Sequence, residues 1–187
     1  DNPELAERIN KLASRCGFTL NGLFVMDGSK RSAHGNAYFT GFGKSRRIVF
    51  FDTLLSKLNG PEIEAVLAHE LGHFEHKHII KRMAISFFVA LVFFALLGYV
   101  KNTIWFYEGL GAPPALMHSN DALALILFFM AVPVFTFLLS PLASWFSRKD
   151  EFQADQYASE QTEAQSLVSA LVKLYDDNAA TLTPDPI

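Results

Sequence analysis

The first half of the chain alternates between helical and strand-like spacing of its apolar residues. In residues 1–16, Leu5, Ile9 and Leu12 recur at helical spacing and predict an amphipathic helix that packs on a core. Three short runs rich in β-branched and aromatic residues follow, separated by glycine-containing turns, and predict a small antiparallel sheet. These runs are residues 20–26, 36–42 and 47–51.

A longer helical pattern begins near residue 59. Asn59-Gly60-Pro61 is typical of a helix start, with proline at the first helical position. Apolar residues then recur at helical spacing, at Ile63, Val66, Leu67 and Leu71. The predicted helix therefore continues through His69 and His73, which lie on one face because they are four residues apart.

Two long segments without charged residues, 84–100 and 122–146, dominate the second half of the chain. A helix over the first spans roughly 26 Å, just enough to cross a bilayer, and the second is long enough to cross with a tilt. Pro133 and Pro141 are expected to kink the second helix or to end it early. Buried core helices of a soluble protein are the alternative, but the remaining residues are too few to cover both. We therefore predict a transmembrane hairpin.

Composition and charge support a membrane protein and give no sign of a nucleic-acid partner. Of 187 residues, 50% are hydrophobic, and the formal net charge is -3, without a basic face that could follow phosphates. Basic residues flank the two apolar segments on their outer sides, at Lys77, Lys81, Arg82, Arg148 and Lys149. By the positive-inside rule both outer flanks are cytoplasmic, so the chain after residue 146 returns to the side of His69.

The strongest chemical signal is His-Glu-Leu-Gly-His, residues 69–73. The imidazoles of His69 and His73, one helical turn apart, can bind one Zn²⁺, and Glu70 projects beside the metal as a general base for water. Two histidines on the solvated face of an amphipathic helix are the alternative. The pattern favours a zinc-dependent hydrolase.

A third zinc ligand is expected just after the second apolar segment. Glu151 and Asp155 lie four residues apart in a helix predicted to run to Asp176. We assign Glu151 as the third ligand, which leaves a fourth position open for water, as in catalytic zinc sites. Asp155 is placed to accept the free ring N–H of a ligand histidine, although a solvated helix face would also explain it.

The extended metzincin pattern does not fit. Its glycine and its third histidine would stand where this chain has His76 and Ile79. His76 and His78 are therefore expected to be structural or solvated.

Together these patterns predict an α+β fold that is mostly helical, with a zinc-protease core, a small antiparallel sheet and a two-helix transmembrane hairpin. We expect three regions. Residues 1–82 hold the first helix, the sheet and the zinc-binding helix, 83–146 form the hairpin, and 147–187 supply the third zinc ligand.

Four separated stretches resemble the membrane zinc metalloproteases of the CAAX prenyl protease 1 type. They are residues 31–41, 47–55, 69–73 with His78 beyond them, and 151–155. This resemblance implies a membrane endopeptidase whose eukaryotic members remove the C-terminal tripeptide from isoprenylated CAAX sequences and also cut a mating-pheromone or lamin precursor.

By position, the resemblance implies the same assignments. The zinc ligands are His69, His73 and Glu151, the general base is Glu70, and the acid that supports a ligand is Asp155. It adds Asn36 and Ala37, on a strand along which the substrate peptide lies in relatives. An extended peptide could pair with the edge of such a strand through backbone hydrogen bonds. A turn or edge residue with only a local hydrogen bond is the alternative for Asn36.

The predicted function is that of an integral membrane zinc metalloendopeptidase that acts near the C-terminus of prenylated CAAX-type proteins. Its cofactor is Zn²⁺, its partners are a peptide or protein substrate and the lipid bilayer, and its zinc site is cytoplasmic, at a bacterial inner membrane or the endoplasmic reticulum. The chain starts at Asp1 and lacks the later arginine that is thought to stabilise the oxyanion in relatives. We therefore expect a fragment that cuts weakly or not at all, because an oxyanion donor contributes about 10²- to 10³-fold to the rate.

Two alternatives stay open. A heat-shock-type quality-control protease of the membrane would carry the same zinc site and would prefer unfolded proteins. A non-catalytic scaffold would keep zinc for stability and would tolerate Glu70→Gln but not His69→Ala.

Overall fold

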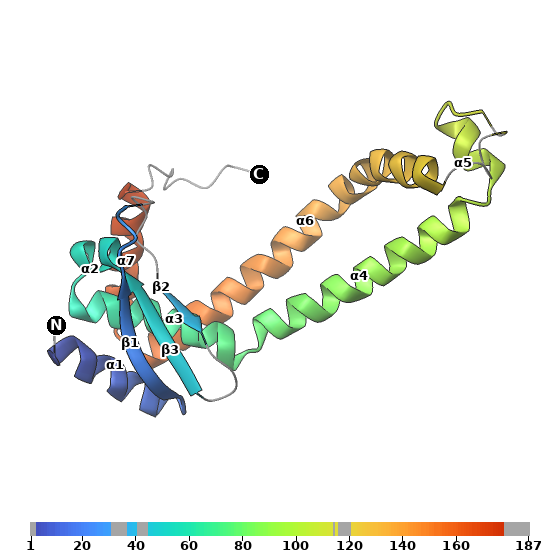
Figure 1. Ribbon diagram of the computed structural model, residues 1–187. Coiled ribbons are helices and arrows are strands. Elements are labelled where there is room, and N and C mark those ends of the chain that lie inside the picture. Colours follow the sequence, from blue (N-terminus) through green and yellow to red (C-terminus); the bar gives the residue numbers. More distant parts are fainter. Residues whose placement is uncertain (1–2, 31–36, 41–44, 114, 116–120, 178–187) are drawn as a thin grey trace. The chain divides into compact units, whose positions relative to one another are not determined.

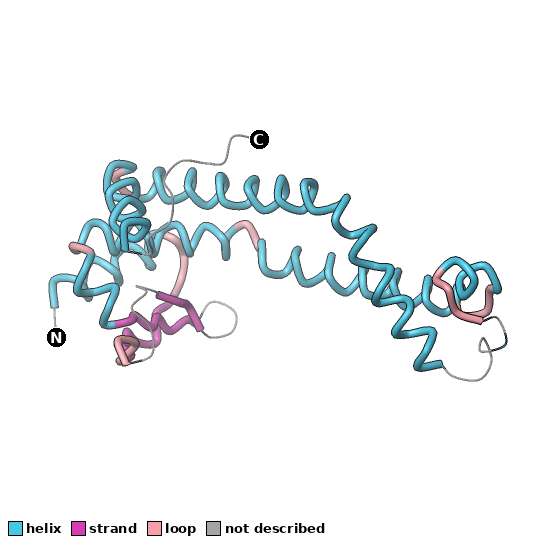
Figure 2. Tube along the Cα trace, turned by 90° about the horizontal axis from the view of Figure 1, so that it is seen from above, coloured by secondary structure: helices cyan, strands magenta, loops and turns pink. Residues whose placement is uncertain are grey.

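The structure, a computed structural model, describes residues 3–30, 37–40, 45–113, 115 and 121–177. The chain divides into two compact units: Asp1–His76 with Asp150–Ile187, and Lys77–Lys149. Figures 1 and 2 show that the described chain is mostly helical, with one small sheet. The first unit holds the predicted zinc-site residues, and the second holds both apolar segments.

The first unit contains a mixed three-stranded sheet. Its strands are β1 (Thr19–Met26), β2 (Ala37–Thr40) and β3 (Ser45–Phe51). β3 lies between the other two, parallel to β1 and antiparallel to β2. The prediction of an antiparallel sheet is therefore wrong for the β1–β3 pair and right only for β2–β3.

The physical reason for the parallel pair lies in the loop after β1. The backbone N–H groups of Gly28 and Ser29 donate to Asp52 Oδ1, at 2.9 and 3.0 Å. The loop is thus tied to the start of α2 (Asp52–Lys57) and does not reverse β1 into a hairpin. The central place goes to β3, whose Ile48 and Phe50 are buried. Alternating apolar residues predict a strand but not its neighbours.

Helices α1 (Pro3–Arg15), α3 (Gly60–Glu75) and α7 (Ala164–Asp177) share one hydrophobic core with the sheet. Its most buried large side chains include Ile9, Leu12, Ile48, Leu54, Leu67 and Leu71. α3 starts as predicted, because the Asn59 side chain accepts from the Glu62 N–H while the Glu62 carboxylate accepts from the Asn59 N–H. This capping box fixes where the helix that carries the two histidines begins.

The single helix predicted from residue 151 to residue 176 is in fact two helices. The first, α6 (Asp121–Gln161), ends at Gln161, and the second, α7, begins at Ala164. The N–H and the hydroxyl of Thr162 both donate to the Ala158 carbonyl at 2.8 Å, and Arg15 donates to the Gln161 carbonyl. The chain turns at this point, and α7 packs against α3.

The second unit consists of α4 (His78–Val100), α5 (Ile104–Gly109) and most of α6. α4 and α6 are both long and apolar enough to cross a membrane, and most of their large apolar side chains are exposed. α6 runs on through Pro133 and Pro141 and does not end early, although Figure 1 shows a bend in its first half. α5 packs on the helices through Tyr107, whose hydroxyl donates to the Lys101 carbonyl at 3.0 Å.

Candidate metal centre

The two histidines of α3 point at one place. His69 Nε2 and His73 Nε2 are 3.2 Å apart, and the two ring planes are inclined by 79°. Both side chains are largely shielded, with exposed fractions of 18% and 15%. The one-turn spacing on a well-capped helix is sufficient to produce this pair.

A carboxylate from α6 completes a triangle with these imidazoles. Glu151 Oε2 lies 3.5 Å from His69 Nε2 and 3.4 Å from His73 Nε2. Zn²⁺ held tetrahedrally at 2.0–2.1 Å by its ligands separates them by about 3.3–3.4 Å, so the three atoms fit the face of such a tetrahedron. Among the described residues, this His-His-Glu set is the group of donors close enough to hold a metal ion.

Asp155, one turn after Glu151, contacts the His69 ring at the nitrogen that faces away from Glu151. Its Oδ1 lies 2.8 Å from His69 Nδ1, close enough to accept the Nδ1–H. A neutral imidazole that donates through Nδ1 has its lone pair on Nε2, which faces Glu151 and His73. The arrangement therefore favours the tautomer that a metal ligand needs.

Glu70 follows the first histidine and has the electrostatics of a base. Burial raises the pKa of its carboxyl above the ordinary value of 4.5, the charge of Glu151 raises it further, and His69 opposes both effects. A carboxylate with a raised pKa accepts a proton more readily than an exposed one. The Glu70 carboxyl thus lies within electrostatic range of His69 and Glu151, two of the predicted metal ligands.

Neither the predicted substrate residue Ala37 nor His76 and His78, which were expected to be structural or solvated, belongs to the His-His-Glu group. Asn36 falls outside the described residues. Ala37 is the first residue of β2, an edge strand, and its side chain is buried in the core of the first unit. His76 caps the end of α3, with its ring edge-on to the Tyr157 ring at 6.2 Å, and His78 is buried at the start of α4.

Two histidines one turn apart on a helix, an adjacent glutamate and a carboxylate from a second helix define the metallopeptidase class of sites. Similarity to known protein families and structures agrees with this class. The sequence model described as peptidase family M48 matches residues 1–186, and the chain belongs to this family. The expected family resemblance is confirmed, and membership implies a metal cofactor.

Individual relatives match the chain along its whole length. CAAX prenyl protease 1 of Saccharomyces cerevisiae is 38% identical, with 100% of this chain and 44% of the relative covered. A CAAX prenyl protease 1 homolog of Arabidopsis thaliana is 39% identical, with 98% and 43% covered. The crystal structure of S. mikatae Ste24p is similar with a TM-score of 0.84 and 35% identity, over 100% of this chain and 46% of that one. The chain spans less than half the length of these relatives.

Proposed function

We propose that the chain is the catalytic segment of a membrane zinc metalloendopeptidase. The observation that carries the proposal is the triangle of His69 Nε2, His73 Nε2 and Glu151 Oε2, with edges of 3.2–3.5 Å. Three protein ligands leave a fourth position open, which is the arrangement of catalytic and not of structural zinc sites.

The proposed chemistry divides among few residues. His69, His73 and Glu151 would hold the zinc, which would supply a positive charge to polarise the scissile carbonyl and to make water more acidic. Glu70 accepts the proton of the attacking water and passes it to the leaving amine when the peptide bond breaks. Asp155 keeps the His69 ring in its orientation throughout. A nucleophilic side chain is not needed for this mechanism.

For the substrate, we propose a peptide or protein cut near a prenylated CAAX-type C-terminus. The support is the name of the relatives, CAAX prenyl protease 1, together with their identity to this chain. The outer edge of β2, which begins at Ala37 and follows Asn36 in sequence, is the proposed place for an extended peptide. The bilayer is the proposed environment, because α4 and α6 are apolar and exposed. The basic outer flanks support a cytoplasmic zinc site.

The first test is metal content, because it does not depend on the parts of the relatives that this chain does not cover. Purified protein in detergent should hold one zinc ion per chain, and Glu151→Ala should lose most of it. Glu70→Gln should keep the zinc. The proposal would be overturned if the original chain takes up no zinc, or if the Glu151→Ala variant binds as much zinc as the original chain.

The second test is cleavage of a farnesylated CAAX peptide, with the same peptide unmodified and an unfolded protein as competing substrates. Glu70→Gln should lower the rate by at least about 10²-fold, since a positioned general base contributes that much. Glu160→Gln is the matched control, because Glu160 is exposed and bonds only to Gln156 among the interactions described. Preference for the unfolded protein would instead favour a quality-control protease.

A further inference from the structure

α3 and the end segment of α6 (residues 150–161) come unusually close at Gly72. A Cβ added to Gly72 would lie 3.0 Å from Ala154 Cα, 3.1 Å from Ala154 O and 3.1 Å from Tyr157 Cβ. Two of these atoms are backbone and the third is fixed directly to backbone, so none can swing aside as a side-chain tip would. Even the smallest side chain at this position would therefore push the two helices apart.

The contact matters because of where it lies on each helix. Gly72 stands directly before His73, and Ala154 stands between Glu151 and Asp155. A displacement at Ala154 therefore moves both carboxylates away from α3, while the two imidazoles stay together because they share one helix. The Glu151 oxygen lies 3.4–3.5 Å from the imidazole nitrogens, and a shift of a few tenths of an ångström already departs from the tetrahedral spacing.

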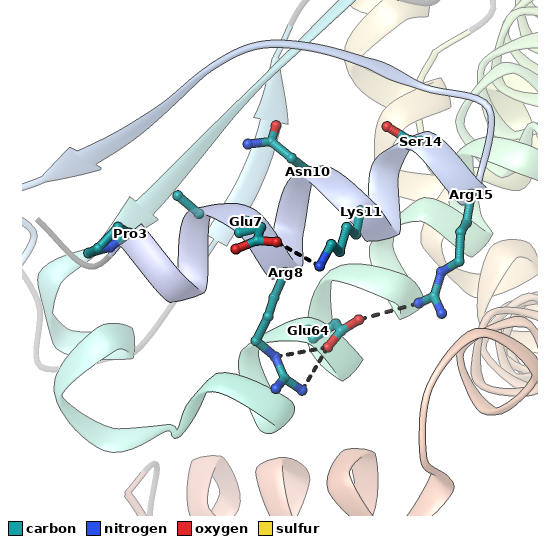
Figure 3. A pocket seen from close by; sticks show the side chains of 9 residues that line it. Pro3, Glu7, Arg8, Asn10, Lys11, Ser14, Arg15 and Glu64 are labelled. Carbon is teal, nitrogen blue, oxygen red and sulfur yellow. Dashed lines mark hydrogen bonds and ion pairs between the residues drawn. The ribbon is translucent and has the colours of Figure 1, made fainter.

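A second tie between the same helices lies at the end of α6. Arg15 Nη2 donates to Glu64 Oε1 on α3 at 3.3 Å and to the carbonyl of Gln161, the last residue of α6, at 3.0 Å. Figure 3 shows Arg15 and Arg8 reaching the Glu64 carboxylate from α1. One guanidinium nitrogen thus links the histidine helix to the helix that carries Glu151, and its charge suits the negative end of α6.

We propose that Gly72 and Arg15 are positioning residues that set the spacing between α3 and the end segment of α6, so that Glu151 reaches the two imidazoles. The inference rests on the proposed function, because Glu151 must be a ligand for the spacing to matter. Gly72 sets the closest approach, and Arg15 holds the far end of the segment in place.

The experiment measures Zn²⁺ affinity by competition with a chromophoric chelator, in the full chain in detergent. Gly72→Ala should weaken binding about 10- to 100-fold, the range found when groups that orient a metal ligand are lost. Arg15→Gln should weaken it about two- to fivefold, because this side chain is 54% exposed.

The decisive comparison repeats both changes in a Glu151→Ala background. If the two residues act mainly through Glu151, each change should weaken Zn²⁺ binding much less once that carboxylate is gone, and the loss that remains comes from the displacement of Asp155 from His69. A residue with a merely structural role would lower the affinity to the same extent in both backgrounds, and that result would overturn the proposal. If Glu151→Ala itself leaves the affinity unchanged, the proposed metal centre fails, and this inference fails with it.

The chain offers a matched control for each change. Gly98→Ala introduces the same methyl group into α4, where a Cβ at Gly98 meets nothing within 4 Å. Lys11→Gln removes a positive charge from α1 whose described ion pair is with Glu7 of the same helix. Both should leave Zn²⁺ affinity unchanged. Should Gly72→Ala fail to fold, Arg15→Gln in the two backgrounds carries the test, and unaltered affinity in the Arg15→Gln chain would overturn the proposal.

Discussion

Glu62 is a buried carboxylate whose removal should measurably loosen the histidine helix. Its side chain lies in the first turn of α3, and the residue is 3% exposed. One oxygen accepts from Ser169 Oγ at 2.6 Å, the other from the Asn59 N–H at 2.8 Å, and Lys173 Nζ lies 2.7–2.8 Å from the two. Glu62→Gln keeps the shape of the side chain but removes its negative charge. It also replaces one acceptor oxygen with an N–H₂ group, which would face groups that themselves donate hydrogen bonds.

The expected cost follows from these contacts. Removing one partner of a fully buried ion pair costs about 3–5 kcal/mol, but Lys173 is 45% exposed and can turn to water. Losing part of the hydrogen bonding to a charged group costs about 1.5–3 kcal/mol. We expect the free energy of unfolding of the first unit to fall by about 2–3 kcal/mol and its thermal midpoint to fall by roughly 10 °C.

The pH dependence gives this prediction its sign. Burial by itself would raise the pKa of Glu62, but the hydrogen bonds from Lys173, Ser169 and Asn59 outweigh burial and hold the pKa below 4.5. The stability that the carboxylate adds is therefore complete above about pH 4.5 and is lost as the pH falls through the lower folded-state pKa. The original chain and Glu62→Gln should differ most at neutral pH and converge in acid.

Circular dichroism melts in detergent between neutral and acid pH test this directly. Glu160→Gln, at an exposed position, should change the free energy of unfolding by less than about 0.5 kcal/mol. The reasoning would be refuted if Glu62→Gln lowers the free energy of unfolding by no more than the control does. It would also be refuted if the difference between Glu62→Gln and the original chain stays the same from neutral to acid pH.

The remaining predictions concern a site residue, the loop after β1 and the metal. Asp155→Asn should weaken Zn²⁺ binding about 10- to 100-fold by competition titration, because the 2.8 Å contact with His69 Nδ1 loses its charge; full affinity would contradict this. Gly28→Ala should destabilise the fold by about 1–3 kcal/mol in thermal melts, because its Cβ would lie 2.5 Å from Phe51 Cδ2; an unchanged midpoint would argue against that clash. Removing metal with a chelator should lower the melting midpoint and stop cleavage, with both restored by added Zn²⁺, because a metal that binds only the folded chain stabilises it.

Local patterns in the sequence were sufficient for much of the structure. The capping signal at Asn59-Gly60-Pro61 predicted the start of α3, and the four-residue spacing of His69 and His73 predicted that their rings would meet. These features depend on neighbours within one or two helical turns, so the sequence contains them directly. The same holds for the two long apolar helices, because length and composition alone define them.

The two predicted membrane crossings return the chain to the side of the histidines, and this predicted that Glu151 lies near them. The distance between Glu151 and the histidines could not be predicted in this way. That distance depends on how closely α6 approaches α3, and Gly72 makes the approach possible by having no side chain. The motif shows a glycine between two candidate ligands, but not what would lie against it. The significance of Gly72 could be found only from the folded structure.

The order of the strands and the break between α6 and α7 were also decided by tertiary contacts. Asp52 binds the loop that was expected to reverse β1, and the backbone of α6 ends where Thr162 and Arg15 take up its last carbonyl groups. The sequence by itself therefore determined most of the helical and extended segments, the two segments that are long and apolar enough to span a membrane, and which side chains share a face. Strand neighbours and helix spacing required the tertiary structure, because they arise from contacts between residues far apart in the chain.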